Sequence, residues 1–224
     1  MIKLKIGNPE VKNAELIKLI KNVQINQYYL NNQKDFRDQV LLNVQKNDSV
    51  LDIGKGMREK FDMINCSNLE TLDVNEYDDY PDILFDLCGE INEDMKNSYD
   101  TIICLAVLEH VYNPFKAIEN ITKLLKDGGK VYGMVPYLYH YHAPNNLKFQ
   151  DYFRFSKDAL SYLFKDFKEV ELYPIRGKIS TSLNILMEGK WKKYIEKTKI
   201  NIFLNKFFNK NLNQCSGYNF ILKK

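Results

Sequence analysis

The sequence predicts an α/β fold in which a mainly parallel sheet carries helices on both faces. A short apolar strand at 49–53 leads into the turn Gly54-Lys55-Gly56, which precedes a helix-like segment. Further strand-like apolar runs follow at intervals, with helices or crossovers between them. Alternation of this kind is typical of a parallel sheet that binds its ligand at the carboxyl ends of its strands.

The chain is organised around the Gly-x-Gly turn. Because Gly54 and Gly56 lack a Cβ, the backbone can turn sharply, and a cofactor can lie against N–H groups at the start of the next helix. Asp52 would place a carboxylate at the strand end, where it meets a cationic or hydroxyl-bearing group. Asp-x-Gly-x-Gly also occurs in ordinary tight loops, so this turn alone does not identify a cofactor.

Composition indicates one soluble globular domain. The chain has 224 residues, of which 45% are hydrophobic and 27% charged, and this suits an ordinary core. The net charge of +3 is too small to indicate nucleic acid as a partner. The amino terminus is too short and too interrupted by lysine to be a signal peptide, and no apolar run is long enough to span a membrane. We therefore expect a cytoplasmic protein.

Cysteine usage agrees with that expectation. The four cysteines show no Cys-x-x-Cys pairing, so we interpret them as reduced, buried thiols rather than as a disulfide or zinc framework. They are Cys66, Cys88, Cys104 and Cys215.

Charge is unevenly distributed along the chain. The segment 69–95 is rich in acidic residues and contains no Lys, Arg or His. From Gly189 onward the sequence has nine lysines and a single acidic residue, Glu196. Such asymmetry indicates solvated faces, or alternatively a basic surface that meets an anionic substrate or a membrane.

The elements are expected in the following order. Helical spacing at 11–45 predicts two helices, which cover a sheet edge or close over the ligand cleft. A short helix near 57–64 follows the first strand, and the second strand, 69–73, ends in Asp73, 19 residues after Gly54. This spacing suits one βαβ unit whose second acid binds the two hydroxyls of a ribose, although Asp73 is equally suited to capping the strand.

The later elements continue the alternation. Strands are expected at 82–87, 99–105, 130–135, 168–173 and 217–222. A helix at 157–164 is expected to begin at Ser156 as its N-cap. Helices are also expected at 179–195 and 200–208, in a long insertion between the last two strands.

The ordered combination of these motifs resembles the class I S-adenosylmethionine-dependent methyltransferases. The motifs are the run 50–56, Asp73, Asp86-Leu87, the segment 99–111 and the segment 124–131. The resemblance covers roughly residues 48–175 and is closest to a bacterial branch whose members often lie among genes for surface polysaccharides. His142-Ala143-Pro144 and the segment 151–155 look like the acceptor-side signature of that branch.

The resemblance implies a Rossmann-like, seven-stranded, mainly parallel sheet whose last strand is antiparallel. Because no internal repeat or low-complexity linker appears, we expect a single methyltransferase domain over residues 1–224. Its parts are an N-terminal helical cover at 1–47, a cofactor-binding core at 48–175, a helical insertion at 176–214 and a final strand at 215–224.

The resemblance also implies S-adenosylmethionine as cofactor and S-adenosylhomocysteine as product. The residues that it assigns to the cofactor are Asp52, Gly54 and Gly56 for the methionine part, Asp73 for the ribose, Asp86 and Leu87 for the adenine edge, Leu105 and Ala106 beside the sulfonium, and Glu109 with His110 at the start of the next helix. Two residues depart from the family pattern. Lys55 places a cation in the loop near the sulfonium, or points to solvent, and Arg58 replaces a third glycine, with pairing to the cofactor carboxylate as an alternative role.

Candidate catalytic residues follow the fifth strand. If the acceptor is a hydroxyl, a base must take its proton, and His142 is the best candidate among the three histidines. Asp151 would orient this histidine or bind the acceptor, and Arg154 would bind an anionic acceptor group; alternatively, the two pair and fix the loop. Because no typical ligand spacing is present, we expect no metal.

These observations predict an O-methyltransferase for a sugar, a sugar nucleotide or a related small polar metabolite in surface-glycan synthesis. Methylation of nitrogen and a non-catalytic scaffold with this fold are alternatives. A dehydrogenase would share the glycine turn, but Glu59 occupies the position of its third glycine. A homodimer contact and a peripheral membrane contact of the lysine- and aromatic-rich insertion remain open.

Overall fold

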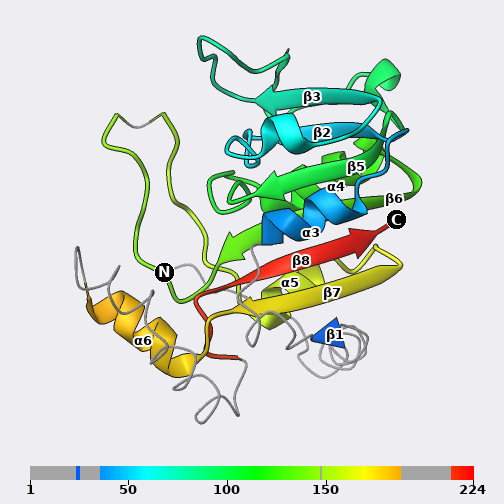
Figure 1. Ribbon diagram of the computed structural model, residues 1–224. Coiled ribbons are helices and arrows are strands. Elements are labelled where there is room, and N and C mark those ends of the chain that lie inside the picture. The colour runs from blue at the N-terminus through cyan, green and yellow to red at the C-terminus, as the bar shows by residue number, and fades with distance from the viewer. Residues whose placement is uncertain (1–23, 26–35, 147, 188–212) are drawn as a thin grey trace, which may run out of the picture.

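A single mixed sheet forms the centre of the protein. The computed structural model describes residues 24–25, 36–146, 148–187 and 213–224, and its eight strands have the order β1-β7-β8-β6-β5-β2-β3-β4 (Figure 1). The strands are β1 (Gln24–Ile25), β2 (Ser49–Ile53), β3 (Asn68–Asp73), β4 (Ile83–Leu84), β5 (Tyr99–Leu105), β6 (Leu125–Pro136), β7 (Glu169–Ile175) and β8 (Gly217–Lys223). All seven predicted strands are therefore present, and β1 adds an eighth at the edge.

The central strands lie in the register that the site needs. β2 pairs in parallel with both β3 and β5, and Ile53 at its end is aligned with Leu72 of β3 and Cys104 of β5. These strands are apolar because both faces of the sheet are covered. Their carboxyl ends consequently meet along one edge, where the arrowheads of β2, β3 and β5 lie together in Figure 1.

The last strand is antiparallel, as predicted. β8 lies between β6 and β7 and pairs antiparallel with both of them. Gly133 of β6 is aligned with Phe220 of β8, whose side chain is fully buried. A Cβ built on Gly133 would lie 1.9 Å from Cζ of Phe220, so only glycine fits beside this ring.

We expect Gly133→Ala to lower the free energy of unfolding by about 2 kcal/mol, because the buried ring of Phe220 must move out of a close-packed core. Urea unfolding followed by circular dichroism measures the change. Phe220→Leu in the Gly133→Ala background should recover part of the loss because it makes room for the methyl group. A Gly133→Ala variant as stable as the wild type would show that the predicted clash is absent.

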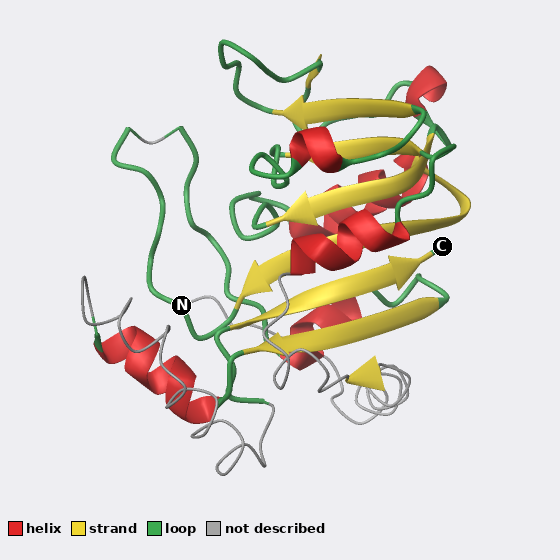
Figure 2. Cartoon of the chain, in the orientation of Figure 1, coloured by secondary structure: helices red, strands yellow, loops and turns green. Residues whose placement is uncertain are grey.

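Helices cover both faces of the sheet (Figure 2). α3 (Phe36–Asn43) lies on one face, and α4 (Pro114–Leu124) and α5 (Lys157–Leu163) lie on the other. The N-cap Ser156 predicted for α5 is confirmed, because its hydroxyl accepts a hydrogen bond from the Ala159 amide. α6 (Lys178–Leu186) follows β7 and is shorter than the predicted helix 179–195. It ends before Met187, whose backbone is extended.

One predicted helix is wrong. Residues 54–60 form successive turns, and only Phe61–Met63 form a short 3-10 helix, in place of the helix near 57–64. A second 3-10 helix, Glu93–Met95, precedes β5. The cause lies in the loop itself, because a buried carboxylate binds the amides at its start, as described below.

Parts of the predicted organisation lie outside the described residues. They include the helix expected in the first part of 11–45, the helix at 200–208 and most of the insertion, so the internal domain boundaries stay a prediction. Within the described part, no helix combines the length and the apolar character needed to cross a membrane. All four cysteines are free, and three of them are buried.

Candidate functional site

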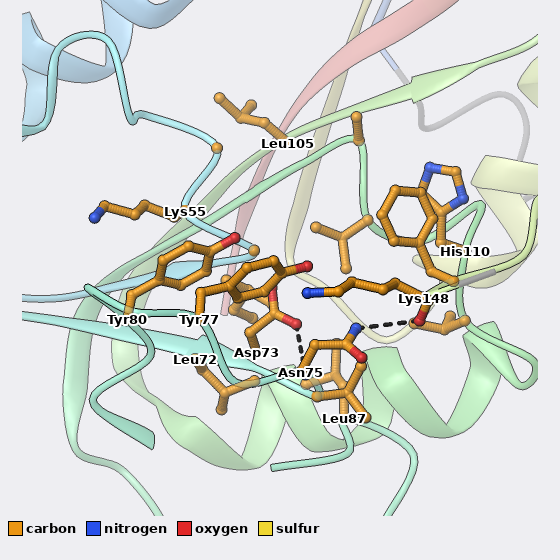
Figure 3. Close-up of a pocket in the computed structure, with 18 of the residues that line it drawn as sticks. Lys55, Leu72, Asp73, Asn75, Tyr77, Tyr80, Leu87, Leu105, His110 and Lys148 are labelled. Atoms are coloured by element: carbon orange, nitrogen blue, oxygen red, sulfur yellow. Dashed lines mark hydrogen bonds between the residues drawn. The ribbon is translucent and has the colours of Figure 1, made fainter. Parts of the chain in front are cut away.

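A pocket of about 540 Å³ lies at the carboxyl ends of β2, β3 and β5. Its walls come from the loop after β2, the segment after β3, the loop after β4, the end of β5 and the segment 148–152 (Figure 3). Volume and position are those of a small-molecule site at the strand ends of an α/β sheet.

The glycine turn forms one wall through close backbone contacts. Gly54 has a positive φ of 73°, and its amide donates to the carbonyl of Leu72. A Cβ on Gly54 would lie 2.9 Å from Val107, and one on Gly56 would lie 2.8 Å from Cβ of Leu105. The loop therefore packs directly against the end of β5 because both positions are glycine.

Asp52 shapes this loop from beneath. Its carboxylate is fully buried and accepts hydrogen bonds from the amides of Gly56 and Met57 at 3.1 and 3.0 Å. Burial raises the pKa of Asp52 to about 7, although these two amide bonds oppose the shift. The sequence predicted a helix N-terminus with free amides after this turn. This prediction is wrong, because the amides of Gly56 and Met57 are already bonded to Asp52. Asp52 itself does not line the pocket.

Asp73 reaches the pocket from the end of β3. Its Oδ1 accepts a hydrogen bond from the Asn75 amide at 2.8 Å, while its Oδ2 accepts none from the residues that the structure describes. In Figure 3, Asp73 lies at the centre of the site. A carboxylate oxygen without a protein partner suits a pair of ligand hydroxyls.

The loop after β4 contributes Asp86 and Leu87, which both line the pocket. Asp86 accepts hydrogen bonds from the Cys88 amide at 2.8 Å and from the Tyr112 hydroxyl at 3.1 Å. Asn120, a fully buried residue of α4, donates to the carbonyl of Leu87 and so anchors this loop. Sequence reasoning missed Asn120, because only its burial distinguishes it from a surface asparagine.

Aromatic residues form a second wall that sequence reasoning also missed. The rings of Tyr77 and Tyr80 stack with centroids 4.4 Å apart, and Nζ of Lys148 lies 4.3 Å from the centroid of Tyr77. The side-chain amide of Asn75 donates to the carbonyl of Lys148 at 3.2 Å, which joins the segment 148–152 to the end of β3 (Figure 3). Tyr77 and Tyr80 lie inside the acidic segment 69–95. Two aromatic residues among so many acids were the sequence feature that could have indicated their place in the pocket.

The cation in the glycine turn is compensated. Nζ of Lys55 lies 2.7 Å from a carboxylate oxygen of Asp79 and 4.9 Å from the ring centroid of Tyr80. In Figure 3 its side chain extends away from His110. Arg58 reaches the same tyrosine, with Nη2 at 3.4 Å from the hydroxyl of Tyr80. The charge of Lys55 is thus directed to Asp79 rather than to the centre of the pocket.

The end of β5 carries an uncommon backbone conformation. Leu105 and Ala106 line the pocket, and Ala106 has a positive φ of 56° although it is not glycine. Its amide donates to the carbonyl of Met134 at 2.9 Å, which holds this conformation. Strained residues of this kind concentrate at ligand sites.

Glu109 and His110 lie in a turn, whereas they were expected at the start of the next helix. α4 begins only at Pro114, with Asn113 as its N-cap. His110 lines the pocket, and its Nδ1 lies 2.6 Å from the carbonyl oxygen of Gln150. Glu109 is fully buried behind it and is not among the pocket residues.

The three candidate catalytic residues meet beside this turn but outside the pocket lining. Nδ1 of His142 lies 3.2 Å from Oδ2 of Asp151, and Nε2 lies 3.6 Å from Oε1 of Glu109. The neighbouring carboxylates, first of all that of Glu109, raise the pKa of His142. His110 packs edge-on against His142, with ring centroids 4.8 Å apart, and lines the pocket, whereas His142 does not.

Arg154 is fully engaged within the loop. Its guanidinium donates to both oxygens of Asp151 and to the carbonyls of Tyr139, His140 and Phe153. Burial raises the pKa of Asp151, but the hydrogen bonds from Arg154 and from the His142 amide outweigh it and lower this pKa to about 2. The geometry therefore matches the alternative in which this pair fixes the loop, and the role of Arg154 in binding an anionic acceptor is not supported.

Comparison with known proteins indicates a methyltransferase domain. A family model described as "Methyltransferase domain" matches residues 24–167, which is more than half of the chain. The ubiquinone biosynthesis O-methyltransferase of Dechloromonas aromatica is 33% identical over 69 residues, and the match spans 31% of this chain and 28% of that protein. The chain thus spans less than a third of the length of this curated relative.

Two solved structures are similar in fold. Haemonchus contortus phosphoethanolamine N-methyltransferase 2, in complex with phosphomonomethylethanolamine and S-adenosylhomocysteine, is 17% identical with a TM-score of 0.51, over 84% of this chain and 52% of that chain. The cyclase SpnF is 13% identical with a TM-score of 0.52, over 84% of this chain and 80% of that chain. At such identities the likeness shows the fold alone, since one of the two similar proteins is a cyclase.

Proposed function

Because the chain belongs to the family of methyltransferase domains, we propose that it transfers a methyl group from S-adenosylmethionine to a hydroxyl of a small polar acceptor. One observation carries the proposal. Oδ2 of Asp73, which accepts no hydrogen bond from the described residues, and the close-packed turn of Gly54 and Gly56 face the same pocket of about 540 Å³. This combination suits a ligand with a ribose at one end and a polar chain that approaches the backbone at the other.

The residues present fit this cofactor. S-adenosylmethionine supplies an electrophilic methyl group on a sulfonium. Asp73 accepts hydrogen bonds from the ribose hydroxyls, and Leu87 flanks the adenine. Ala106 and Leu105 at the end of β5 lie beside the reacting methyl group, and the pairing of Lys55 with Asp79 keeps a competing cation away from it.

The protein's main task is positioning. The acceptor oxygen must lie in line with the C–S bond, so that the new C–O bond forms as the C–S bond breaks and S-adenosylhomocysteine leaves. Residues of the segment 148–152 line the pocket, and the hydrogen bond from Asn75 to the carbonyl of Lys148 joins this segment to the end of β3, so we expect it to limit the access of water. The hydroxyl proton leaves on the side of His110, which contacts the pocket, rather than directly to His142, which lies behind it.

The acceptor class rests on sequence resemblance. The acceptor-side segment around His142 and the segment 151–155 resembles that of a branch linked to surface polysaccharides, so a sugar or sugar nucleotide is the proposed acceptor. Of the two methyltransferases among the relatives reported above, one is named for methylation of oxygen and one for methylation of nitrogen. The nature of the acceptor atom is accordingly part of the proposal.

A transfer assay tests this function. The purified chain is incubated with S-adenosylmethionine that carries a trideuterated methyl group, together with sugars, sugar nucleotides or phosphoethanolamine, and the products are analysed by mass spectrometry. We expect a hydroxyl compound to gain one labelled methyl group and S-adenosylhomocysteine to accumulate in equal amount. Labelling of phosphoethanolamine alone would refute the choice of oxygen, and cofactor binding without any labelled product would favour the scaffold alternative.

A further inference from the structure

Glu109 carries a fully buried carboxylate. Its side chain is 0% exposed, and neither Oε1 nor Oε2 accepts a hydrogen bond from the residues that the structure describes. An ionised carboxylate in such a place is strongly unfavourable unless a cation compensates it. The surroundings of Glu109 should therefore supply a positive charge, either as a protonated His142, whose pKa Glu109 raises, or as a bound cation, and metal titration distinguishes the two.

Two imidazoles face this carboxylate. Nε2 of His142 lies 3.6 Å from Oε1 of Glu109, and Nε2 of His110 lies 3.9 Å from the same oxygen. Both distances exceed that of a hydrogen bond. They are close to the separation of two ligands on one metal ion, because ligands at 2.0 to 2.2 Å from a tetrahedral zinc lie about 3.4 Å apart.

The Nδ1 atom of each ring defines which tautomer the histidine adopts. Nδ1 of His110 lies 2.6 Å from the carbonyl oxygen of Gln150. Nδ1 of His142 lies 3.4 Å from the carbonyl oxygen of His140 and 3.2 Å from Oδ2 of Asp151. Carbonyl and carboxylate oxygens only accept hydrogen bonds, so in the neutral rings the proton is on Nδ1. Both Nε2 lone pairs are then available toward Glu109. Metal-binding histidines are oriented by carbonyl or carboxylate partners in the same way.

We propose that Glu109, His110 and His142 bind a divalent transition-metal cation such as Zn²⁺. One ligand atom from each residue lies within 4.8 Å of the other two. Two imidazoles and one carboxylate favour a transition metal over Mg²⁺ or Ca²⁺, which prefer oxygen ligands. Sequence spacing predicts no metal, because the site joins a turn to a histidine 32 positions further along the chain.

The position of the cluster suggests its use. His110 is both a ligand and a pocket residue, and three protein ligands leave a coordination position open. If the proposed methyl transfer holds, an acceptor hydroxyl bound at that position has a lowered pKa. The ion would supply this acidification, and the proton would pass to water on the side of His110, whose Nε2 would bind the ion rather than accept the proton. This catalytic use rests on the proposed function, whereas metal binding itself does not.

Calorimetric titration of the full chain with Zn²⁺, after treatment with a chelator and its removal, tests the site without any cofactor. We expect one ion per chain at micromolar affinity or tighter. Glu109→Gln and His142→Gln should each weaken binding more than about 100-fold, since loss of an outer partner alone costs up to that factor. His140→Gln is the matched control, because this exposed histidine lies two residues from His142 but outside the cluster, and it should bind as the wild type does.

Absence of stoichiometric binding would overturn the proposal, as would binding that is unchanged in both ligand variants or lost in the control. Absorption spectra of the wild-type chain with Co²⁺ provide a second measurement that needs no variant. We expect visible d–d bands from bound Co²⁺ that disappear when Zn²⁺ displaces the Co²⁺. Absence of these bands would equally overturn the site. Titration with S-adenosylhomocysteine is independent, so failure of the metal site and failure of the methyltransferase assignment are distinguishable.

Discussion

Replacing Asp73 with alanine is expected to weaken S-adenosylhomocysteine binding about 100-fold. The carboxylate of Asp73 has an oxygen without a protein partner in the described part of the chain and faces the pocket from the end of β3. Hydrogen bonds to a charged group are worth about 1.5 to 3 kcal/mol each, so loss of the ribose contacts costs about 3 kcal/mol. Isothermal titration calorimetry measures the affinity directly.

Asp78→Ala is the control for this prediction. Asp78 belongs to the same acidic stretch and is exposed, but it does not line the pocket. Its removal should leave the affinity within about twofold, because exposed charges at a distance are screened. An equal effect of the two substitutions would mean that Asp73 acts through the overall charge rather than through a hydrogen bond.

Gly56→Val is expected to weaken cofactor binding still further, by more than about 100-fold. The first added carbon would already lie 2.8 Å from Cβ of Leu105 and 3.3 Å from its carbonyl oxygen. The turn must therefore move away from β5, and the amide of Gly56 then leaves the buried carboxylate of Asp52. Both the cofactor wall and the loop that supports it are lost, at a cost in the upper range for overpacking.

Gly128→Ala separates this local effect from general destabilisation. Gly128 has a positive φ of 78°, but nothing lies within 4 Å of its added Cβ, and it is not a pocket residue. It should cost about 1 kcal/mol of stability through backbone strain and leave the affinity unchanged. Calorimetry and thermal unfolding of both variants distinguish the two effects, and normal binding by a folded Gly56→Val chain would contradict the assigned role of the turn.

Local patterns in the sequence predict the sheet well. Apolar runs such as 49–53 and 99–105 become strands because both faces of a parallel sheet are buried, and this requirement is visible in each run separately. The position of Asp73 at a strand end was likewise predictable from its spacing to Gly54. The pattern could not show that Asp52 turns inward, because the amides that it binds are defined by the fold of the loop.

Contacts between distant segments were beyond prediction. Lys148 meets Tyr77, and His142 meets His110 and Glu109, only because a long loop returns over the strand ends. The helix expected near 57–64 failed for a related reason. Its helical pattern competes with Asp52, which holds the amides of Gly56 and Met57 in a turn.

The central claim is that the pocket at the ends of β2, β3 and β5 binds the adenosyl and methionine parts of one cofactor. Titration of the wild-type chain with S-adenosylhomocysteine, with NAD as the comparison ligand, tests it most directly. We predict one site with micromolar affinity for S-adenosylhomocysteine and no measurable binding of NAD. No binding of S-adenosylhomocysteine, or tighter binding of NAD, would contradict it.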